Sequence, residues 1–265
     1  MASVDVHQHF WPEPVITALS RRKEPPCLVG GVLELQEGSF ETDLSVHDVD
    51  RRLQLLDRYE IERAVVSFPP TMGFEEAPEL AEAYDESILE VTAASGGRLL
   101  PLACGAEREG FVGTCVSAER VAREADAVTG SLLFVHPGYA PAVPNGLPGW
   151  WNPIVHYTAV TEAAYAAWVA SGRTDATVVF AIMAGGAPFQ LERFASRGAS
   201  TEAPPNVYFD TASYGRRAVE LTIDGGGVDR IVFGSDAPVM DPGATIDALG
   251  DRFERAAANA AALFA

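Results

Sequence analysis

Short apolar segments alternate with helix-forming segments along the whole of this chain. The apolar segments carry few charges, and glycine or proline follows several of them. Strands of this kind, joined by helices, are typical of a parallel sheet. Eight such units predict an α/β fold, the (β/α)8 or TIM barrel, formed as a single domain over residues 1–265. The eight predicted strands lie within residues 3–11, 63–68, 99–103, 111–116, 131–136, 176–183, 206–210 and 230–236.

Two places depart from a regular repeat of strand and helix. Only about seven residues lie between the third and fourth predicted strands, which is too short for a crossover helix. We therefore expect the barrel to be slightly degenerate there. After the first strand, a short helix at 12–22 and a segment at 28–44 with Gly30-Gly31 and alternating polarity predict a small hairpin insert.

The composition excludes several kinds of partner. A net charge of −18 argues against binding to nucleic acid and to anionic membranes, which require a basic surface. No run approaches the roughly 18 apolar residues of a membrane span, and the start of the chain has no apolar secretion segment. The three cysteines show no metal-finger or disulfide spacing. We expect a cytoplasmic protein that acts on a small molecule, and the sequence leaves a homodimer open.

Candidate metal ligands occur where predicted strands end. His7 and His9 are two residues apart on the first strand, so their side chains leave the same face. His136 ends the fifth predicted strand and Asp236 ends the eighth. Because the C-terminal ends of barrel strands surround one mouth, these four side chains can meet there. Three imidazoles and a carboxylate would suit one divalent ion, most plainly zinc.

The ordered combination of motifs resembles the amidohydrolase superfamily, in its amidohydrolase-related branch of small metal-dependent hydrolases and decarboxylases. The resemblance spans almost the whole chain and implies a TIM barrel in which His7, His9, His136 and Asp236 bind one divalent ion. The matching motifs are DVHQHFW at 5–11, VHPG at 135–138, AGGAP at 184–188, FDT at 209–211 and GSD at 234–236.

One position departs from the family pattern. The resemblance places a histidine directly before the glycines after the sixth strand, where Met183 stands here. Methionine cannot transfer a proton, so Asp236 could act as the base, His156 could approach the site, or the usual activity could be lost. The family's two-metal members use a lysine on the fourth strand, where this chain has Cys115, so we expect a single ion and a buried thiol. His47 is expected at the surface.

Our leading hypothesis is a mononuclear metal-dependent hydrolase of a small cyclic or aromatic ester, lactone or amide, with Asp236 as catalytic base. A non-oxidative decarboxylase with the same ligands is the second hypothesis. A barrel that has kept its scaffold for binding or an accessory role, because of Met183, is the third. Seven apolar and aromatic side chains could line the substrate pocket: Phe10, Trp11, Phe68, Trp150, Trp151, Met183 and Tyr214.

Overall fold

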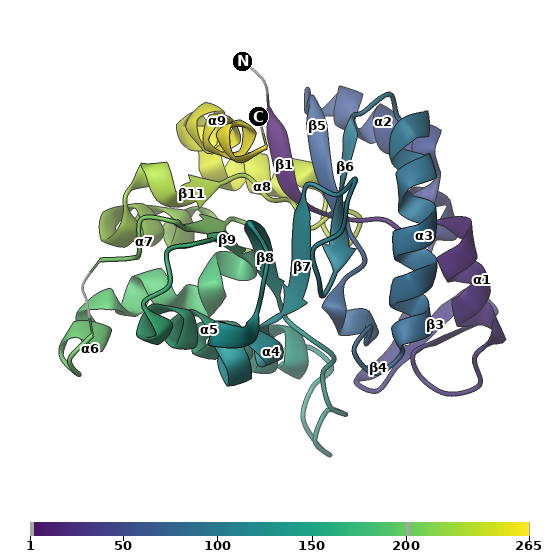
Figure 1. Cartoon of the computed structure of the whole chain (residues 1–265), viewed down its shortest axis with the longest axis horizontal. Coiled ribbons are helices and arrows are strands. Elements are labelled where there is room, and N and C mark those ends of the chain that lie inside the picture. Colours follow the sequence, from purple (N-terminus) through teal and green to yellow (C-terminus); the bar gives the residue numbers. More distant parts are fainter. Residues whose placement is uncertain (1–2, 200–201, 265) are drawn as a thin grey trace.

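The computed structural model describes residues 3–199 and 202–264, and its eight parallel strands confirm the predicted barrel (Figure 1). Neighbouring strands pair in the order in which they occur along the chain. Backbone hydrogen bonds from Val6 to Phe233 and from His9 to Ala237 join β1 to the residues that directly follow the last strand and close the barrel. The strands are β1 (Val4–His9), β5 (Arg63–Ser67), β6 (Leu99–Cys104), β7 (Gly113–Ser117), β8 (Leu132–His136), β9 (Thr177–Phe180), β10 (Val207–Asp210) and β11 (Ile231–Val232).

Helices connect most of these strands and surround the barrel (Figure 1). No helix lies between β6 and β7, as the short connection predicts. The α-helices are α1 (Glu13–Arg21), α2 (Val49–Arg58), α3 (Pro78–Ala94), α4 (Ala118–Glu124), α5 (Tyr157–Ser171), α6 (Leu191–Ala195), α7 (Arg216–Gly226), α8 (Pro242–Leu249) and α9 (Phe253–Leu263). Shorter helical turns are η1 (Leu44–His47), η2 (Pro70–Met72), η3 (Ala125–Ala127), η4 (Asn152–His156), η5 (Ala181–Gln190), η6 (Val228–Arg230) and η7 (Gly250–Arg252).

Polar side chains fix where two of these helices begin. The Asp48 carboxylate accepts a hydrogen bond from the backbone N–H of Arg51, and Ser117 does the same for Arg120. Such caps satisfy backbone donors that a helix start leaves without partners. Helix α2 therefore begins at Val49, with Asp48 as its cap, and the separate turn η1 precedes it.

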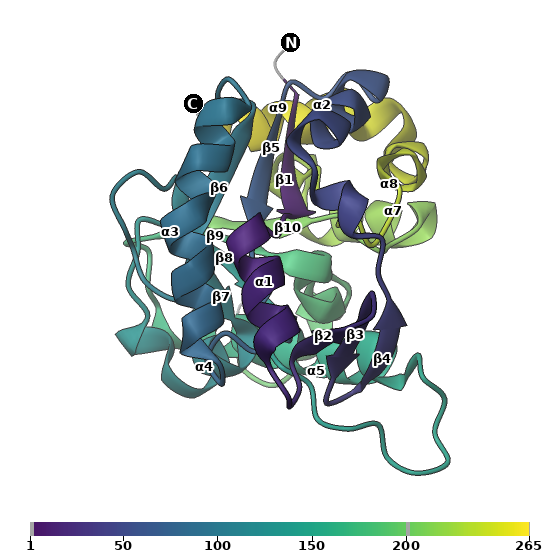
Figure 2. The same cartoon turned by 90° about the vertical axis from the view of Figure 1, so that its right-hand side faces the viewer.

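The insert after β1 forms a three-stranded antiparallel sheet, one strand more than the predicted hairpin. Its strands are β2 (Cys27–Val29), β3 (Val32–Leu35) and β4 (Gly38–Glu41). Gly30 and Gly31 both have positive φ, which allows the tight turn between β2 and β3. Figure 2 shows this sheet at the end of the barrel toward which the β1 and β5 arrows point. The insert therefore lies on the side where the candidate ligands are found.

The segment after β9 differs from its predicted form. Strand β9 ends at Phe180, and Ile182, Met183 and Ala184 adopt left-handed backbone angles, with φ of 46, 50 and 51°. Met183 thus lies in an irregular turn and not on a strand. The reason is local packing, because a Cβ at the following Gly185 would lie 2.1 Å from the carbonyl oxygen of Thr158 on α5. The turn can approach α5 so closely only with glycine there.

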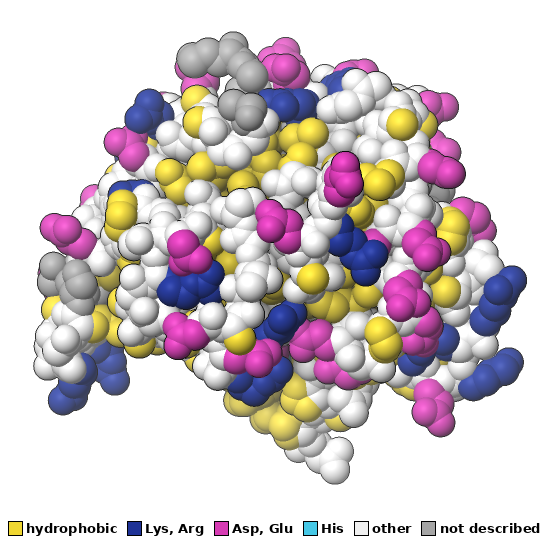
Figure 3. All heavy atoms as spheres, in the orientation of Figure 1, with side chains coloured by type: hydrophobic (Ala, Val, Ile, Leu, Met, Phe, Trp, Pro, Cys, Tyr) yellow, Lys and Arg dark blue, Asp and Glu magenta, His cyan; other side chains and the backbone are white. Residues whose placement is uncertain are grey.

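The surface agrees with the charge of the sequence. Acidic side chains are scattered over the face shown in Figure 3, and the basic ones form no continuous patch there. Across residues 3–199 and 202–264, no helix is long and apolar enough to cross a membrane.

Candidate metal centre

Three histidines and one aspartate meet at the C-terminal mouth of the barrel. His7 and His9 come from the end of β1, His136 ends β8, and Asp236 follows β11. One ligand atom from each lies within 4.8 Å of the other three. The Nε2 atoms of His7 and His9 are 3.2 Å apart, and the Asp236 Oδ1 atom is 3.4 and 3.2 Å from them. The sequence thus identified side chains that the fold brings together.

These side chains fit a divalent ion by their spacing and orientation. Tetrahedral ligands about 2.0–2.1 Å from zinc lie about 3.3 Å from one another, close to the separations seen here. The Nδ1–H of His136 donates to the Pro137 carbonyl oxygen at 2.9 Å, which leaves its Nε2 as an acceptor. Ring nitrogens that face each other at 3.2 Å repel unless a proton or a cation lies between them. The cluster therefore has the donor set and the spacing for a bound cation, and without one the proton of His7 can lie between the two rings.

Burial sets the protonation of the three histidines in the absence of metal. Burial opposes the charged form of His7, but the carboxylates of Asp210 and Asp236 outweigh it and raise the pKa of His7 to about 9. Burial lowers the pKa of His9 and of His136 well below the usual value, and the charge of His7 adds to both shifts. Two of the three imidazoles are thus neutral at neutral pH, the form that binds metal. Burial also raises the pKa of Asp236.

Asp210, which the sequence analysis did not select, fixes the orientation of His7. Its Oδ2 atom lies 2.5 Å from the Nδ1 atom of His7, and both side chains are fully buried. Its Oδ1 atom accepts backbone hydrogen bonds from Ile182 at 2.8 Å and from Ala212 at 3.1 Å. A carboxylate behind a ligand histidine selects the tautomer whose Nε2 faces the metal. The signal in the sequence was an acid at the end of the seventh strand, within the FDT motif.

A second buried aspartate fastens β1 to the turn that carries Asp236. Asp5 accepts hydrogen bonds from the backbone N–H and the hydroxyl of Ser235, at 3.0 and 2.6 Å. It also accepts from the side chain of Gln8, whose oxygen in turn accepts from the buried guanidinium of Arg52. These bonds tie the first and last strands together directly behind the ligands.

Three of the predicted pocket residues lie in the core. Phe10, Phe68 and Met183 are at most 1% exposed and belong to one hydrophobic cluster. The Met183 sulfur accepts a hydrogen bond from the Thr222 hydroxyl of α7 at 3.2 Å. Contact of these three with a substrate stays a prediction.

The other four predicted pocket residues are partly exposed or have an unpaired polar atom among the described residues. Trp11 is buried, but its indole N–H has no hydrogen-bond partner among the described residues, which leaves it a donor for a ligand. Trp150 is 58% exposed and Trp151 is half-buried, both in the connection after β8. Tyr214 is half-buried, and its ring packs edge-to-face against Phe189. Contact of these four with a substrate stays a prediction.

The two remaining histidines are outside the cluster. His47 was expected at the surface, and this is wrong, because it is 7% exposed and stacks on the ring of Trp11. Burial and the charge of Arg52 lower its pKa to about 3. His156 is half-buried, and its Nε2 atom lies 3.5 Å from the Oε1 atom of Glu119. Neither belongs to the group that could hold an ion.

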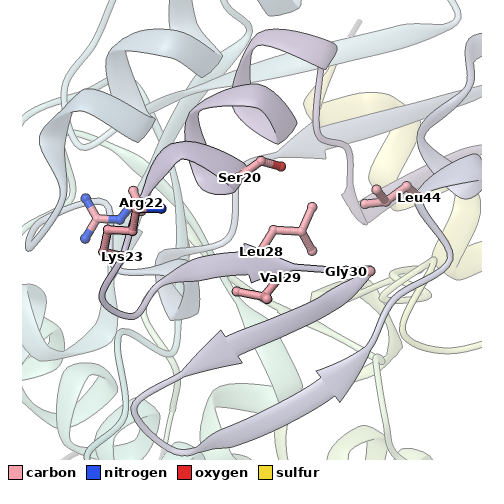
Figure 4. A pocket seen from close by; sticks show the side chains of 8 residues that line it. Ser20, Arg22, Lys23, Leu28, Val29, Gly30 and Leu44 are labelled. Atoms are coloured by element: carbon pink, nitrogen blue, oxygen red, sulfur yellow. The ribbon is translucent and has the colours of Figure 1, made fainter.

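An open hollow lies on the outer side of the insert, between α1 and the three-stranded sheet (Figure 4). Ser20, Arg22 and Lys23 line it together with Leu28 and Val29. None of the four candidate ligands is among its lining residues. We therefore assign it no part in the chemistry of the metal centre.

Comparison with solved structures shows that other proteins share this fold. The first, the IDCase of Metarhizium anisopliae, is 18% identical over 99% of this chain and 97% of that one, with a TM-score of 0.73. The 2,6-dihydroxybenzoate decarboxylase from Rhizobium is 16% identical over 100% and 98%, with a TM-score of 0.67. A 5-carboxyvanillate decarboxylase from Novosphingobium aromaticivorans, with bound manganese, is 14% identical over 99% and 97%, with a TM-score of 0.65.

Identities this low show the fold alone, and a search of curated proteins finds no match. The family model is more specific. The amidohydrolase model, in its second branch, matches residues 4–264 and so includes every strand of the barrel and all four candidate ligands. The resemblance seen in the sequence motifs is confirmed, and the chain belongs to the amidohydrolase family.

Proposed function

We propose that this protein is a divalent-metal-dependent hydrolase of a small cyclic or aromatic ester, lactone or amide. The observation that carries the proposal is the convergence of three imidazoles and one carboxylate at the mouth of a barrel of the amidohydrolase family. His7, His9, His136 and Asp236 would hold the ion. When bound, a divalent ion lowers the pKa of water toward about 7 and polarises a substrate carbonyl.

Asp236 is the proposed base because of how its two oxygens are placed. Its Oδ1 atom faces the histidines at 3.2–3.4 Å, which leaves Oδ2 to take a proton from water. Burial raises the pKa of this carboxyl, which makes it a better proton acceptor than an exposed aspartate. Met183 cannot share this task, since a thioether does not transfer a proton and its sulfur faces Thr222.

The donor set favours zinc, because three imidazoles with one carboxylate suit that ion. Manganese is the second candidate, since two of the structures with this fold contain it. Metal analysis of the purified protein decides whether an ion is held and which one. We expect about one ion per chain in the parent and a loss of metal in His9→Ala. His156→Ala removes a histidine outside the cluster and should keep the ion. A metal-free parent that takes up no added ion would refute the proposal.

Decarboxylation of an aromatic carboxylic acid is the alternative, and the decarboxylases among the structures with this fold support it. The metal ligands alone do not separate the two reactions. Parallel assays do: acid release from lactones, aryl esters and amides reports hydrolysis, and carbon dioxide release from hydroxybenzoates reports decarboxylation. We expect acid release that His9→Ala abolishes. Carbon dioxide release with no hydrolysis would favour the alternative.

A further inference from the structure

The insert after β1 contacts the connection that follows β8. The turn between β3 and β4 carries Gln36 and Glu37. The backbone N–H of Gln36 donates to the hydroxyl of Tyr139 at 3.2 Å, and the hydroxyl of Tyr157 donates to Glu37 Oε1. Tyr139 follows His136 by three residues, and Tyr157 begins α5. The insert therefore binds the two ends of the connection that starts at a metal ligand.

Tyr157 lies within the electrostatic reach of the metal centre. Burial raises its pKa, and the carboxylates of Glu37, Glu119 and Asp236 raise it further. Glu119 is itself near the ligands, since its Oε2 atom accepts a hydrogen bond from the backbone N–H of Gly138 at 2.8 Å. The contact between Glu37 and Tyr157 thus forms part of the surroundings of the mouth.

Glu37, Tyr157 and Glu119 offer hydrogen-bond acceptors near the mouth. Tyr157 uses its proton on Glu37, and Glu37 uses one of its two oxygens. The Oε1 atom of Glu119 is buried and has no hydrogen-bond partner among the described residues, although the Nε2 atom of His156 lies 3.5 Å from it. Among the described residues, no lysine or arginine donates a hydrogen bond to any of these three side chains. A substrate hydroxyl or amide N–H would find an acceptor in Glu37, whereas a substrate carboxylate would meet the like charge of Glu37, for which no basic partner is seen among the described residues.

We propose that Glu37 and Tyr157 are specificity-determining residues of the substrate site. The insert supplies one wall of the mouth. Glu37 and Tyr157 accept a hydrogen bond from a neutral group at the end of the substrate that is remote from the metal. A carboxylate at that end of the substrate is excluded. This inference rests on the proposed function, because it assumes that the substrate approaches the metal centre. It adds a selection for substrates that are neutral at their far end.

Substituted benzohydroxamates test this selection by binding, without turnover. The hydroxamate is a metal-binding group common to every probe, and the ring position remote from it carries either hydroxymethyl or carboxylate. Calorimetry gives the dissociation constant of each probe for metal-loaded protein, in both the 3- and the 4-substituted series. We expect hydroxymethyl to bind more tightly than carboxylate by about tenfold in at least one series, the scale of one hydrogen bond to a charged group.

Variants locate the source of the preference. Glu37→Gln should bring the carboxylate probe to within about threefold of the hydroxymethyl probe, because it removes the repelling charge and keeps the shape. Tyr157→Phe should weaken the hydroxymethyl probe selectively. Glu41→Gln is the matched control, since it removes the same charge from an exposed position on the same sheet and should leave the ratio unchanged. Equal thermal stability and metal content across the variants would exclude a merely structural effect.

Three results would overturn the inference: equal or tighter binding of the carboxylate probes by the parent, a ratio that Glu37→Gln leaves unchanged, or no binding of any probe to protein shown to hold its metal. A protein that holds no metal refutes the proposed function instead. Metal analysis run beside the calorimetry tells the two failures apart.

Discussion

Asp210→Asn tests whether the acid behind His7 selects the tautomer that a metal needs. The Oδ1 atom of Asp210 accepts from the backbone N–H groups of Ile182 and Ala212, so the single oxygen of an asparagine must take this place. The asparagine NH2 group would then face the Nδ1 atom of His7, now 2.5 Å from a carboxylate oxygen. Because two donors cannot face each other, the proton of neutral His7 would move to Nε2, the atom turned toward the metal.

The magnitude follows from that displaced proton. The variant must release it or break the new hydrogen bond before His7 can bind an ion. Loss of such a support for a ligand histidine typically weakens metal binding about 10- to 100-fold, or about 1.4–2.7 kcal/mol. The shape of the side chain does not change, so the barrel should fold. The loss of the Asp210 charge should also lower the pKa of His7, since that charge is a main cause of its rise.

Competition with a fluorescent chelator measures the affinity of parent and variant for zinc and for manganese. Asp251→Asn is the control, because Asp251 is exposed and pairs with Arg252 on the surface. We expect a loss of affinity in Asp210→Asn and none in Asp251→Asn. Affinity in Asp210→Asn equal to that of the parent, in a protein with unchanged circular dichroism, would refute the role of Asp210.

Three further outcomes can be measured. In metal-free protein, the free energy of unfolding in urea should be greatest near pH 6.5. At pH values below about 6.5 it should fall, because the pKa values of His9 and His136 are lowered in the folded protein. Between about pH 6.5 and pH 9 it should fall by about 3 kcal/mol, because the pKa of His7 is raised to about 9 in the folded protein. A flat profile would contradict these shifts. Gly185→Ala should destabilise the protein by about 4 kcal/mol or more in chemical unfolding, because its Cβ would overlap the Thr158 carbonyl, whereas Gly172→Ala, with similar φ and open space, should cost about 1–2 kcal/mol. Met183→His should lower stability by about 1–3 kcal/mol without raising turnover, because the imidazole would be buried with one partner, Thr222; a gain in turnover would show that this position reaches the substrate.

The barrel could be predicted because its signals are local. Each strand is a short apolar run with a clear stop, and parallel strands place their C-terminal ends at one mouth. The meeting of His7, His9, His136 and Asp236 follows from this rule, since each lies at or just after a strand end. No knowledge of side-chain packing was needed.

Features that depend on packing could not be predicted in the same way. Asp210 looked like any acid after a strand, and its role rests on the proximity of β10 to the β1 ligand His7, two strands far apart in the sequence. Phe10 and Phe68 each come directly after a strand that ends in a polar residue, His9 and Ser67, yet their side chains are buried in the core. The contact between Glu37 and Tyr157 depends on how the insert meets the connection after β8 and the start of α5, which no local pattern describes.

The position of Met183 changes how the missing histidine is understood. Among the described residues, six other than glycine have positive φ, and five of them are in the turns directly after β9, β10 and β11. Such residues cost about 1–2 kcal/mol each, so the mouth concentrates strain that the surrounding bonds must hold. Asp210 holds the first turn through Ile182, and the backbone N–H of Asp236 donates to the His7 carbonyl oxygen at 2.8 Å.

The ligand geometry is therefore a property of these linked turns and not of any one side chain. A histidine at position 183 would point at Thr222 unless the whole turn after β9 changed its backbone. An inactive Met183→His variant consequently would not argue that the barrel has only a binding role. It would agree with a turn after β9 that holds residue 183 against Thr222.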